Sequence, residues 1–186
     1  MSRVEIKIGG FGGQGVILAG IIIGRAAALH DGKDATLTQT FGPEARGGAC
    51  SAQVVISRER NLYPVVTCPD VLVVMSQPAF DKFSLDISPQ GLVLYEESLV
   101  SPGELQAECK AFGIPATRFA EEMGRKMVLN IIMLGFFAAL SDLVAAEAIK
   151  EAISESVPAG TQKLNLNAFT RGYNYGLELR KKYDGE

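Results

Sequence analysis

The chain has 186 residues, of which 47% are hydrophobic and 21% are charged, a balance typical of folded globular proteins and unlike that of disordered ones. A chain of this length can bury well over half of its unfolded surface in one core, so we expect residues 1–186 to form a single domain. The formal net charge of −3 gives no electrostatic basis for binding nucleic acid.

The cysteines and the single histidine do not form a metal-binding pattern. Cys50, Cys68 and Cys109 lie far apart, and three thiols cannot supply the four ligands of an iron–sulfur cluster. His30 alone does not complete a zinc site. An odd, scattered set of cysteines without a secretory signal indicates a reduced, cytoplasmic protein, and no apolar stretch has the length and composition of a membrane span.

The first forty residues begin with a strand, a glycine turn and a helix. Val4–Ile8 alternates apolar and polar residues, glycines follow, and Val16–Leu29 is almost entirely apolar. A second, β-branched strand is expected over Ala35–Thr40. The turn matches G-x-G-x-x-G, so its backbone N–H groups, at a helix N-terminus, can face an anion. The candidate cofactor-facing residues of this turn are Gly10, Gly12, Gly13, Gln14 and Gly15.

The glycine turn does not predict binding of NAD in the usual manner. That reading needs an acidic residue at the end of the second strand, which here ends in Gln39-Thr40, whereas Asp31 and Asp34 precede the strand. The alternative is that the glycines serve only helix–sheet contact, as we expect for Gly20 and Gly24 in the helix. Gln14, a polar residue at the start of an apolar helix, favours the functional reading.

The segment Phe41–Ala49 is a second candidate loop. Arg46 can pair bidentately with a carboxylate or phosphate, and Glu44 can hold it in place. Gly42, Gly47 and Gly48 leave the backbone open to close approach. This loop follows the second strand as the glycine turn follows the first, so we expect both at the same edge of the sheet. The alternative is a surface turn with an exposed ion pair.

The rest of the chain alternates strands and helices. We expect strands over residues 51–57, 71–75, 91–95 and 114–117, and helices over 78–83, 101–112, 120–140, 145–156 and 165–182. This order predicts an α/β fold: a mainly parallel twisted sheet with a Rossmann-like beginning, helices on both faces and a helical C-terminal third. Asn130 lies within the expected helix 120–140. A buried Asn needs hydrogen-bond partners, which one of the two loops or the local backbone can supply.

No catalytic constellation is recognisable in the sequence. There is one histidine, no Ser/His/Asp set, no phosphate-binding P-loop and no pair of carboxylates at a motif spacing. A chain with a binding edge and no chemistry of its own has the character of one part of a larger enzyme.

At this point the sequence resembles the gamma subunits of the 2-oxoacid:ferredoxin oxidoreductases over essentially its whole length. The matching segments are Gly10–Val16, Phe41–Gly48, Val54–Ser57, Pro69-Asp70, Asn130 with Leu134-Gly135, Asn167–Phe169 and Gly172-Tyr173. Gly-Pro-Glu-Ala-Arg-Gly-Gly followed by Ala-Cys-Ser is most similar to the 2-oxoglutarate type, with the pyruvate and branched-chain types as alternatives.

The resemblance implies a multi-subunit enzyme that decarboxylates a 2-oxoacid on thiamine diphosphate and Mg. Electrons then pass through iron–sulfur clusters to ferredoxin, and the acyl group passes to coenzyme A. Alpha and beta partners, with or without a small ferredoxin-like delta subunit, would carry these cofactors, and this chain alone would bind none.

Within such an enzyme, the two loops would dock on the alpha and beta subunits and border the coenzyme A and substrate entrance. Gln14, Glu44, Arg46 and the loop glycines would make contacts and would not act as acid–base catalysts. Two alternatives stay open: a free-standing module that binds a nucleotide or coenzyme A, and a purely structural subunit. Self-association of the isolated chain is also left open.

Overall fold

The computed structural model describes residues 3–40, 49–59, 63–105 and 108–185 of the chain. The opening strand, turn and helix are present as predicted: β1 spans Val4–Phe11 and α1 spans Val16–Arg25. The glycine cluster therefore begins inside the strand. The last turn of the first helix is a π-helix, Ala26–His30.

The described residues form a six-stranded sheet with the order β2-β3-β1-β4-β5-β6. The remaining strands are β2 (Asp34–Thr40), β3 (Ala49–Ser57), β4 (Val71–Val74), β5 (Leu92–Glu96) and β6 (Lys110–Ile114). Strands β1, β4, β5 and β6 are parallel to one another, which confirms the mainly parallel sheet. Strand β3 runs antiparallel to both of its neighbours, β1 and β2.

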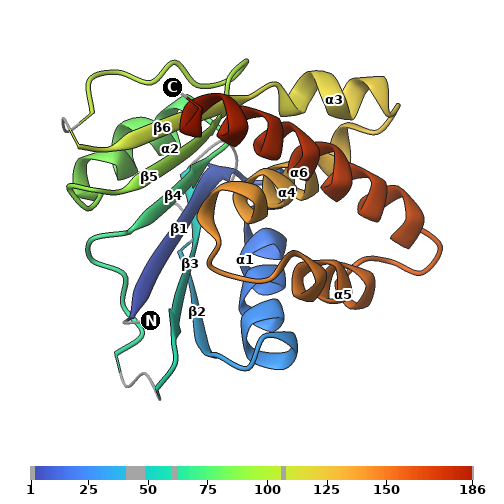
Figure 1. The fold of residues 1–186 in the computed structure, drawn as a ribbon, viewed down its shortest axis with the longest axis horizontal. Coiled ribbons are helices and arrows are strands. Elements are labelled where there is room, and N and C mark those ends of the chain that lie inside the picture. The colour runs from blue at the N-terminus through green and yellow to red at the C-terminus, as the bar shows by residue number, and fades with distance from the viewer. Residues whose placement is uncertain (1–2, 41–48, 60–62, 106–107, 186) are drawn as a thin grey trace.

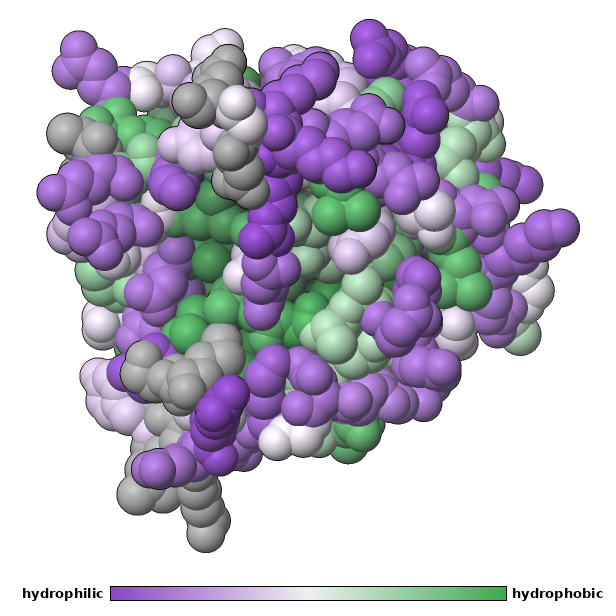
Figure 2. Space-filling view, in the orientation of Figure 1, coloured by the Kyte–Doolittle hydropathy of each residue, from purple (hydrophilic) through white to green (hydrophobic). Residues whose placement is uncertain are grey.

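Helices cover both faces of the sheet, as predicted. On one face lie α1, α4 (Leu129–Ser141), α5 (Ala146–Ser156) and α6 (Gln162–Asp184), and on the other lies α2 (Gln77–Phe83), which a short 3-10 turn, Ser84–Asp86, follows (Figure 1). Alternate residues of β4 separate accordingly: Val71 and Val73 join the core under the large helical layer, whereas Leu72 and Val74 pack in the smaller core under α2. Hydrophobic residues gather in the centre of the face drawn in Figure 2, with hydrophilic residues around them. No helix of the described part of the chain is both long and apolar enough to cross a membrane.

Helices α4 and α6 cross at backbone contact. A Cβ placed on Gly135 of α4 would overlap the carbonyl oxygen of Phe169, and one placed on Gly172 of α6 would overlap the carbonyl oxygen of Ile132. Only residues without a side chain allow two helices to approach this closely. The contact lies in the core, since Phe136, Phe137 and Phe169 next to it are fully buried.

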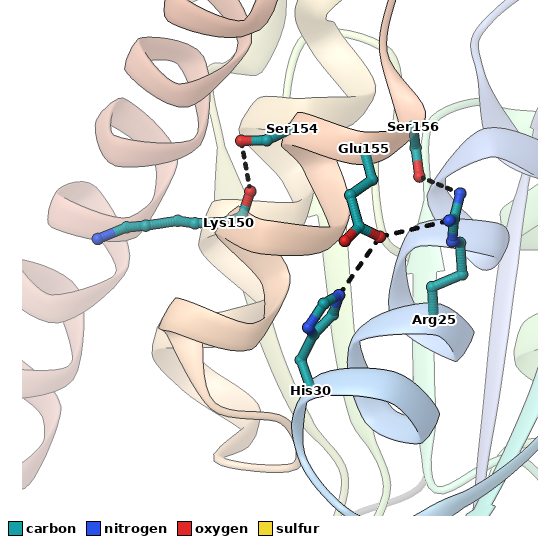
Figure 3. Close-up of polar contacts among 6 residues, drawn as sticks. All are labelled: Arg25, His30, Lys150, Ser154, Glu155 and Ser156. Carbon is teal, nitrogen blue, oxygen red and sulfur yellow. Dashed lines mark hydrogen bonds and ion pairs between the residues drawn. The ribbon is translucent and has the colours of Figure 1, made fainter.

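A polar cluster joins the end of the first helix to the end of α5 (Figure 3). One oxygen of Glu155 lies 3.3 Å from the Arg25 guanidinium and 3.4 Å from Nε2 of His30. Arg25 also donates to the hydroxyl of Ser156 at 3.3 Å. His30 therefore has a carboxylate partner on a neighbouring helix and takes part in packing of helix ends.

The helix predicted over residues 101–112 is wrong. Residues 101–105 have no regular structure, and Lys110–Ile114 forms the edge strand β6, paired in parallel with β5. The Ser-Pro-Gly-Glu start signal is local, and strand pairing over the following residues overrides it. Gly113 does not stop a helix: a Cβ there would lie 2.8 Å from the ring of Tyr95 on β5.

The prediction of a strand over residues 114–117 and one helix over 120–140 is also wrong. Helix α3 spans Ala116–Glu122, and Gly124, with φ of 70°, reverses the backbone after it. A 3-10 turn, Lys126–Val128, leads into α4. Helix α5 begins one residue later than expected, and α6 begins at Gln162, so Asn165 lies in its first turns and donates to Thr161.

We predict that Gly135→Ala destabilises the chain although alanine favours helices. The added methyl group must push α4 away from α6, and overpacking of this kind costs about 1 to 3 kcal/mol. Gly24→Ala in α1 is the matched control, because a Cβ there meets nothing within 4 Å and gains up to about 1 kcal/mol of helix propensity. Denaturant unfolding should show opposite shifts of the unfolding midpoint for the two variants, and equal shifts would contradict the helix-crossing contact.

The expectation that both Gly20 and Gly24 pack on the sheet is correct for only one of them. A Cβ at Gly20 would lie 2.6 Å from that of Ala52, whereas a Cβ at Gly24 would meet nothing within 4 Å.

Candidate functional site

The ends of β1 and β2 lie at the same edge of the sheet, as predicted. Both strands pair with β3, and the beginning of β3 lies between their ends: Ser51 is opposite Gly9 of β1 and also opposite Thr40 of β2. Because β3 is antiparallel to both, its first residues mark the edge at which β1 and β2 finish. The end of β2 therefore lies at the same edge as the glycine turn, with β3 between them.

The glycine turn has an open backbone and an inner side that is tightly packed. Gly13 and Gly15 have φ of 93° and 74°, which disfavours other residues at both positions. Gly12 and Gly13 are exposed, and a Cβ on either would meet nothing within 4 Å, so a ligand can approach the main chain. At Gly10, by contrast, a Cβ would lie 2.6 Å from the Gln14 amide oxygen.

Gln14 holds the turn in shape. Its Oε1 accepts a hydrogen bond from the Phe11 N–H at 2.6 Å, and its Nε2 donates to the carbonyl of Met75 at 2.8 Å. Met75 follows β4, so this side chain connects the turn to the end of the neighbouring strand. The amide of Gln14 is engaged by main-chain groups, and its role at the turn is positioning.

Asn130 hydrogen-bonds to the backbone of the glycine turn. It lies at the start of α4, is 2% exposed, and its Nδ2 donates to the carbonyl of Gly15 at 3.2 Å. Of the two alternatives for its hydrogen-bond partner, a loop and the local backbone, the structure shows the loop. The side chain also explains Gly15, because a Cβ at that position would overlap the Asn130 amide.

The second set of predicted site residues lies outside the described residues. These are Gly42, Glu44, Arg46, Gly47 and Gly48. Their place in the chain fixes only that they connect the end of β2 to the beginning of β3.

Sequence reasoning missed a buried polar group at the same edge. Glu96, fully buried, ends β5, and its Oε1 accepts a hydrogen bond from the N–H of Thr117 at 3.0 Å, which caps the start of α3. Its Oε2 and the Thr117 hydroxyl make no hydrogen bond within the described part of the chain, and the same holds for the Ser76 hydroxyl at the start of α2. The signal was available in the sequence, since Glu96 directly follows the apolar run Leu92–Tyr95.

The cysteines do not contribute a reactive group to this edge. Cys50, opposite Gly10 in the β1–β3 ladder, is 7% exposed, and burial raises the pKa of its thiol, which keeps it protonated at neutral pH. Among the residues described, no three His, Cys, Asp or Glu side chains gather as metal ligands. What this edge can do chemically is to present main-chain N–H groups to an anion or to a protein surface.

Comparison with known proteins identifies the family of this chain. The family model described as pyruvate ferredoxin/flavodoxin oxidoreductase matches residues 5–175. The chain belongs to this family. The 2-oxoglutarate synthase subunit KorC of Methanocaldococcus jannaschii is 50% identical over 179 residues, which cover 95% of this chain and 96% of the relative.

Two solved structures have this fold. The gamma subunit of a keto/oxoacid ferredoxin oxidoreductase from Geobacter sulfurreducens has a TM-score of 0.83 and 37% identity, over 96% of this chain and 98% of that one. A 2-oxoglutarate:ferredoxin oxidoreductase from Magnetococcus marinus, with 2-oxoglutarate, coenzyme A and succinyl-CoA bound, has a TM-score of 0.85 and 26% identity. That match covers 95% of this chain and 31% of the Magnetococcus chain.

We predict that Gln14→Ala loosens the glycine turn and leaves the fold intact. The substitution removes two hydrogen bonds to main-chain groups, each contributing about 1 kcal/mol. Amide hydrogen exchange should accelerate at residues 11–15 and stay slow in β4. Gln90→Ala is the control, because Gln90 is exposed and its side chain hydrogen-bonds to the side chain of Glu108, away from the turn. Unchanged exchange in the turn would contradict the positioning role of Gln14.

Proposed function

We propose that this chain is the gamma subunit of a 2-oxoglutarate:ferredoxin oxidoreductase and has no activity alone. The reaction of the assembled enzyme would convert a 2-oxoacid, coenzyme A and oxidised ferredoxin into acyl-coenzyme A, CO₂ and reduced ferredoxin. The observation that carries the proposal is the 50% identity to a KorC subunit over nearly the full length of both chains. The bound 2-oxoglutarate and coenzyme A named for the Magnetococcus enzyme support the same substrate class.

Alpha and beta subunits, with or without a small delta subunit, would carry the cofactors. Thiamine diphosphate with Mg supplies the chemistry that cleaves the carbon–carbon bond of a 2-oxoacid, and iron–sulfur clusters carry electrons to ferredoxin. The three free cysteines of this chain support a reducing, cytoplasmic setting for the complex.

The glycine turn would border the entrance used by coenzyme A and substrate. Support comes from the open main chain at Gly12 and Gly13, which suits the close approach of a phosphate group or of a partner's backbone. Arg46 would add a guanidinium at the same edge, because its segment follows the end of β2. These groups would bind and orient a ligand or partner, with no proton transfer assigned to them.

Two alternative functions predict different behaviour. A free-standing nucleotide- or coenzyme A-binding module would bind its ligand saturably as an isolated chain. A purely structural subunit would join the complex, but changes in the loops would alter assembly without changing substrate kinetics.

We predict that 2-oxoglutarate-dependent reduction of ferredoxin or of a viologen dye appears only when this chain is expressed with its alpha and beta partners. The isolated chain should be inactive because it lacks a catalytic set of its own. Turnover by the isolated chain, or full activity of the partners without it, would refute the proposal. Pyruvate and 3-methyl-2-oxobutanoate as competing substrates test the assignment of 2-oxoglutarate.

We predict that Arg46→Ala weakens assembly or raises the KM for coenzyme A by about tenfold, as expected for loss of one charge-assisted contact of 1.4 kcal/mol or more. Arg118→Ala, which removes an exposed arginine on α3, serves as the control. An intact complex with unchanged kinetics in the Arg46 variant would remove this residue from the entrance.

A further inference from the structure

Lys7 is a buried lysine that the glycine turn and its supporting residues do not use. It lies on β1, is 9% exposed, and its Nζ is 4.6 Å from the centre of the Phe83 ring on α2. The side chain points to the sheet face opposite α1, since the same ring of Phe83 also covers Gly9, two residues further along the strand. Among the residues described, its ammonium group forms no ion pair.

The neighbouring carboxylates do not neutralise this charge. Glu5, on the same face of β1, directs Oε2 to the N–H groups of Thr67 and Cys68 at 2.7 and 3.0 Å, and its Oε1 pairs with Arg3 at 2.8 Å. Asp86 favours the charged form of Lys7 only through space, and the nearby Lys82 opposes it. Burial outweighs both carboxylates and lowers the pKa of Lys7.

A row of polar side chains crosses the sheet at Lys7. Gln53 of β3 lies opposite Lys7, and Thr38 of β2 lies opposite Gln53, so the three side chains form one row across the sheet. The rows on either side place further hydroxyl groups on this face. We call the polar face the set Lys7, Thr36, Thr38, Thr40 and Gln53, while Ser51 and Val55 on the same face of β3 are buried.

No described helix covers the β2 end of the polar face. On this side of the sheet the helix is α2, which packs against β1 and β4 and also contacts β3 (Figure 1). A polar face with a buried, uncompensated ammonium beside it is suited to a hydrogen-bonding protein surface that brings a carboxylate.

We propose that the polar face docks a partner subunit of the enzyme and that a carboxylate of that subunit pairs with Lys7. The proposal rests on the proposed function, because it takes the occupant from the same complex. It commits to a protein partner since hydroxyl and amide groups extend from Lys7 over three strands, which is wider than one small anion needs. The surface lies on one face of the sheet and reaches the edge that carries the glycine turn, so it would extend the contact between this chain and its partners.

The test compares Lys7→Met, Lys7→Arg and Lys82→Met in the complex and in the isolated chain. Lys82 is the matched control, because it is exposed on α2 and lies 5.7 Å from the same Phe83 ring. Lys7→Met should raise the dissociation constant of this chain from its partners at least about tenfold, since it leaves the partner's carboxylate buried without a counter-charge. Lys7→Arg should recover most of that loss, and Lys82→Met should bind as the unchanged chain does.

The unfolding midpoint of the isolated chain is a second measurement, for which we expect a different result. Because the ammonium is uncompensated there, Lys7→Met should keep or raise the unfolding midpoint while it weakens the complex. Thr38→Trp, which adds bulk to the polar face away from Lys7, should also weaken the complex and leave the isolated chain folded.

Three results would overturn the docking surface. The first is tight assembly with both Lys7→Met and Thr38→Trp. The second is a fall in the unfolding midpoint of the Lys7→Met variant that accounts for its loss of binding. The third is a raised KM for coenzyme A in that variant with an unchanged dissociation constant, which would make Lys7 part of a small-anion site. All three leave the gamma-subunit proposal standing, provided that the unchanged chain still assembles into an active enzyme.

Discussion

The backbone contact between α4 and α6 is the constraint on which the rest of the fold depends. Two glycines, Gly135 and Gly172, let the helices touch through their main chains. The start of α4 carries Asn130, whose amide reaches the carbonyl of Gly15. The same helix therefore packs on α6 through Gly135 and contacts the glycine turn through Asn130, which links the core to the candidate site.

The sequence was most informative where a pattern is strong and local. The alternation of Val4–Ile8, the glycines and the apolar run after Gly15 define their elements without help from distant residues. It was least informative at residues 101–124, where the start signal at Ser101 suggested a helix but pairing with β5 makes a strand. Gly124 shows the same limit, because a glycine inside an apolar helical pattern does not reveal from sequence whether it bends, ends or merely occupies the helix.

The candidate site was only partly predictable for a related reason. Motif spacing identified the glycine turn and Gln14, and burial predicted that Asn130 needs a partner. Spacing could not indicate that the Gln14 amide turns back onto Phe11 and Met75, because Met75 is 61 residues away in the chain. Lys7 was invisible for the opposite reason: an alternating strand normally exposes a lysine, and only the packing of Phe83 over it makes its charge costly.

The reversed direction of β3 has a mechanical consequence. Its first residues are hydrogen-bonded into two ladders at once, with the end of β1 on one side and the end of β2 on the other. A displacement of the beginning of β3 would therefore act on both neighbouring strands directly through main-chain hydrogen bonds. Any group that contacts the start of β3 therefore lies within one strand of both the end of β1 and the end of β2.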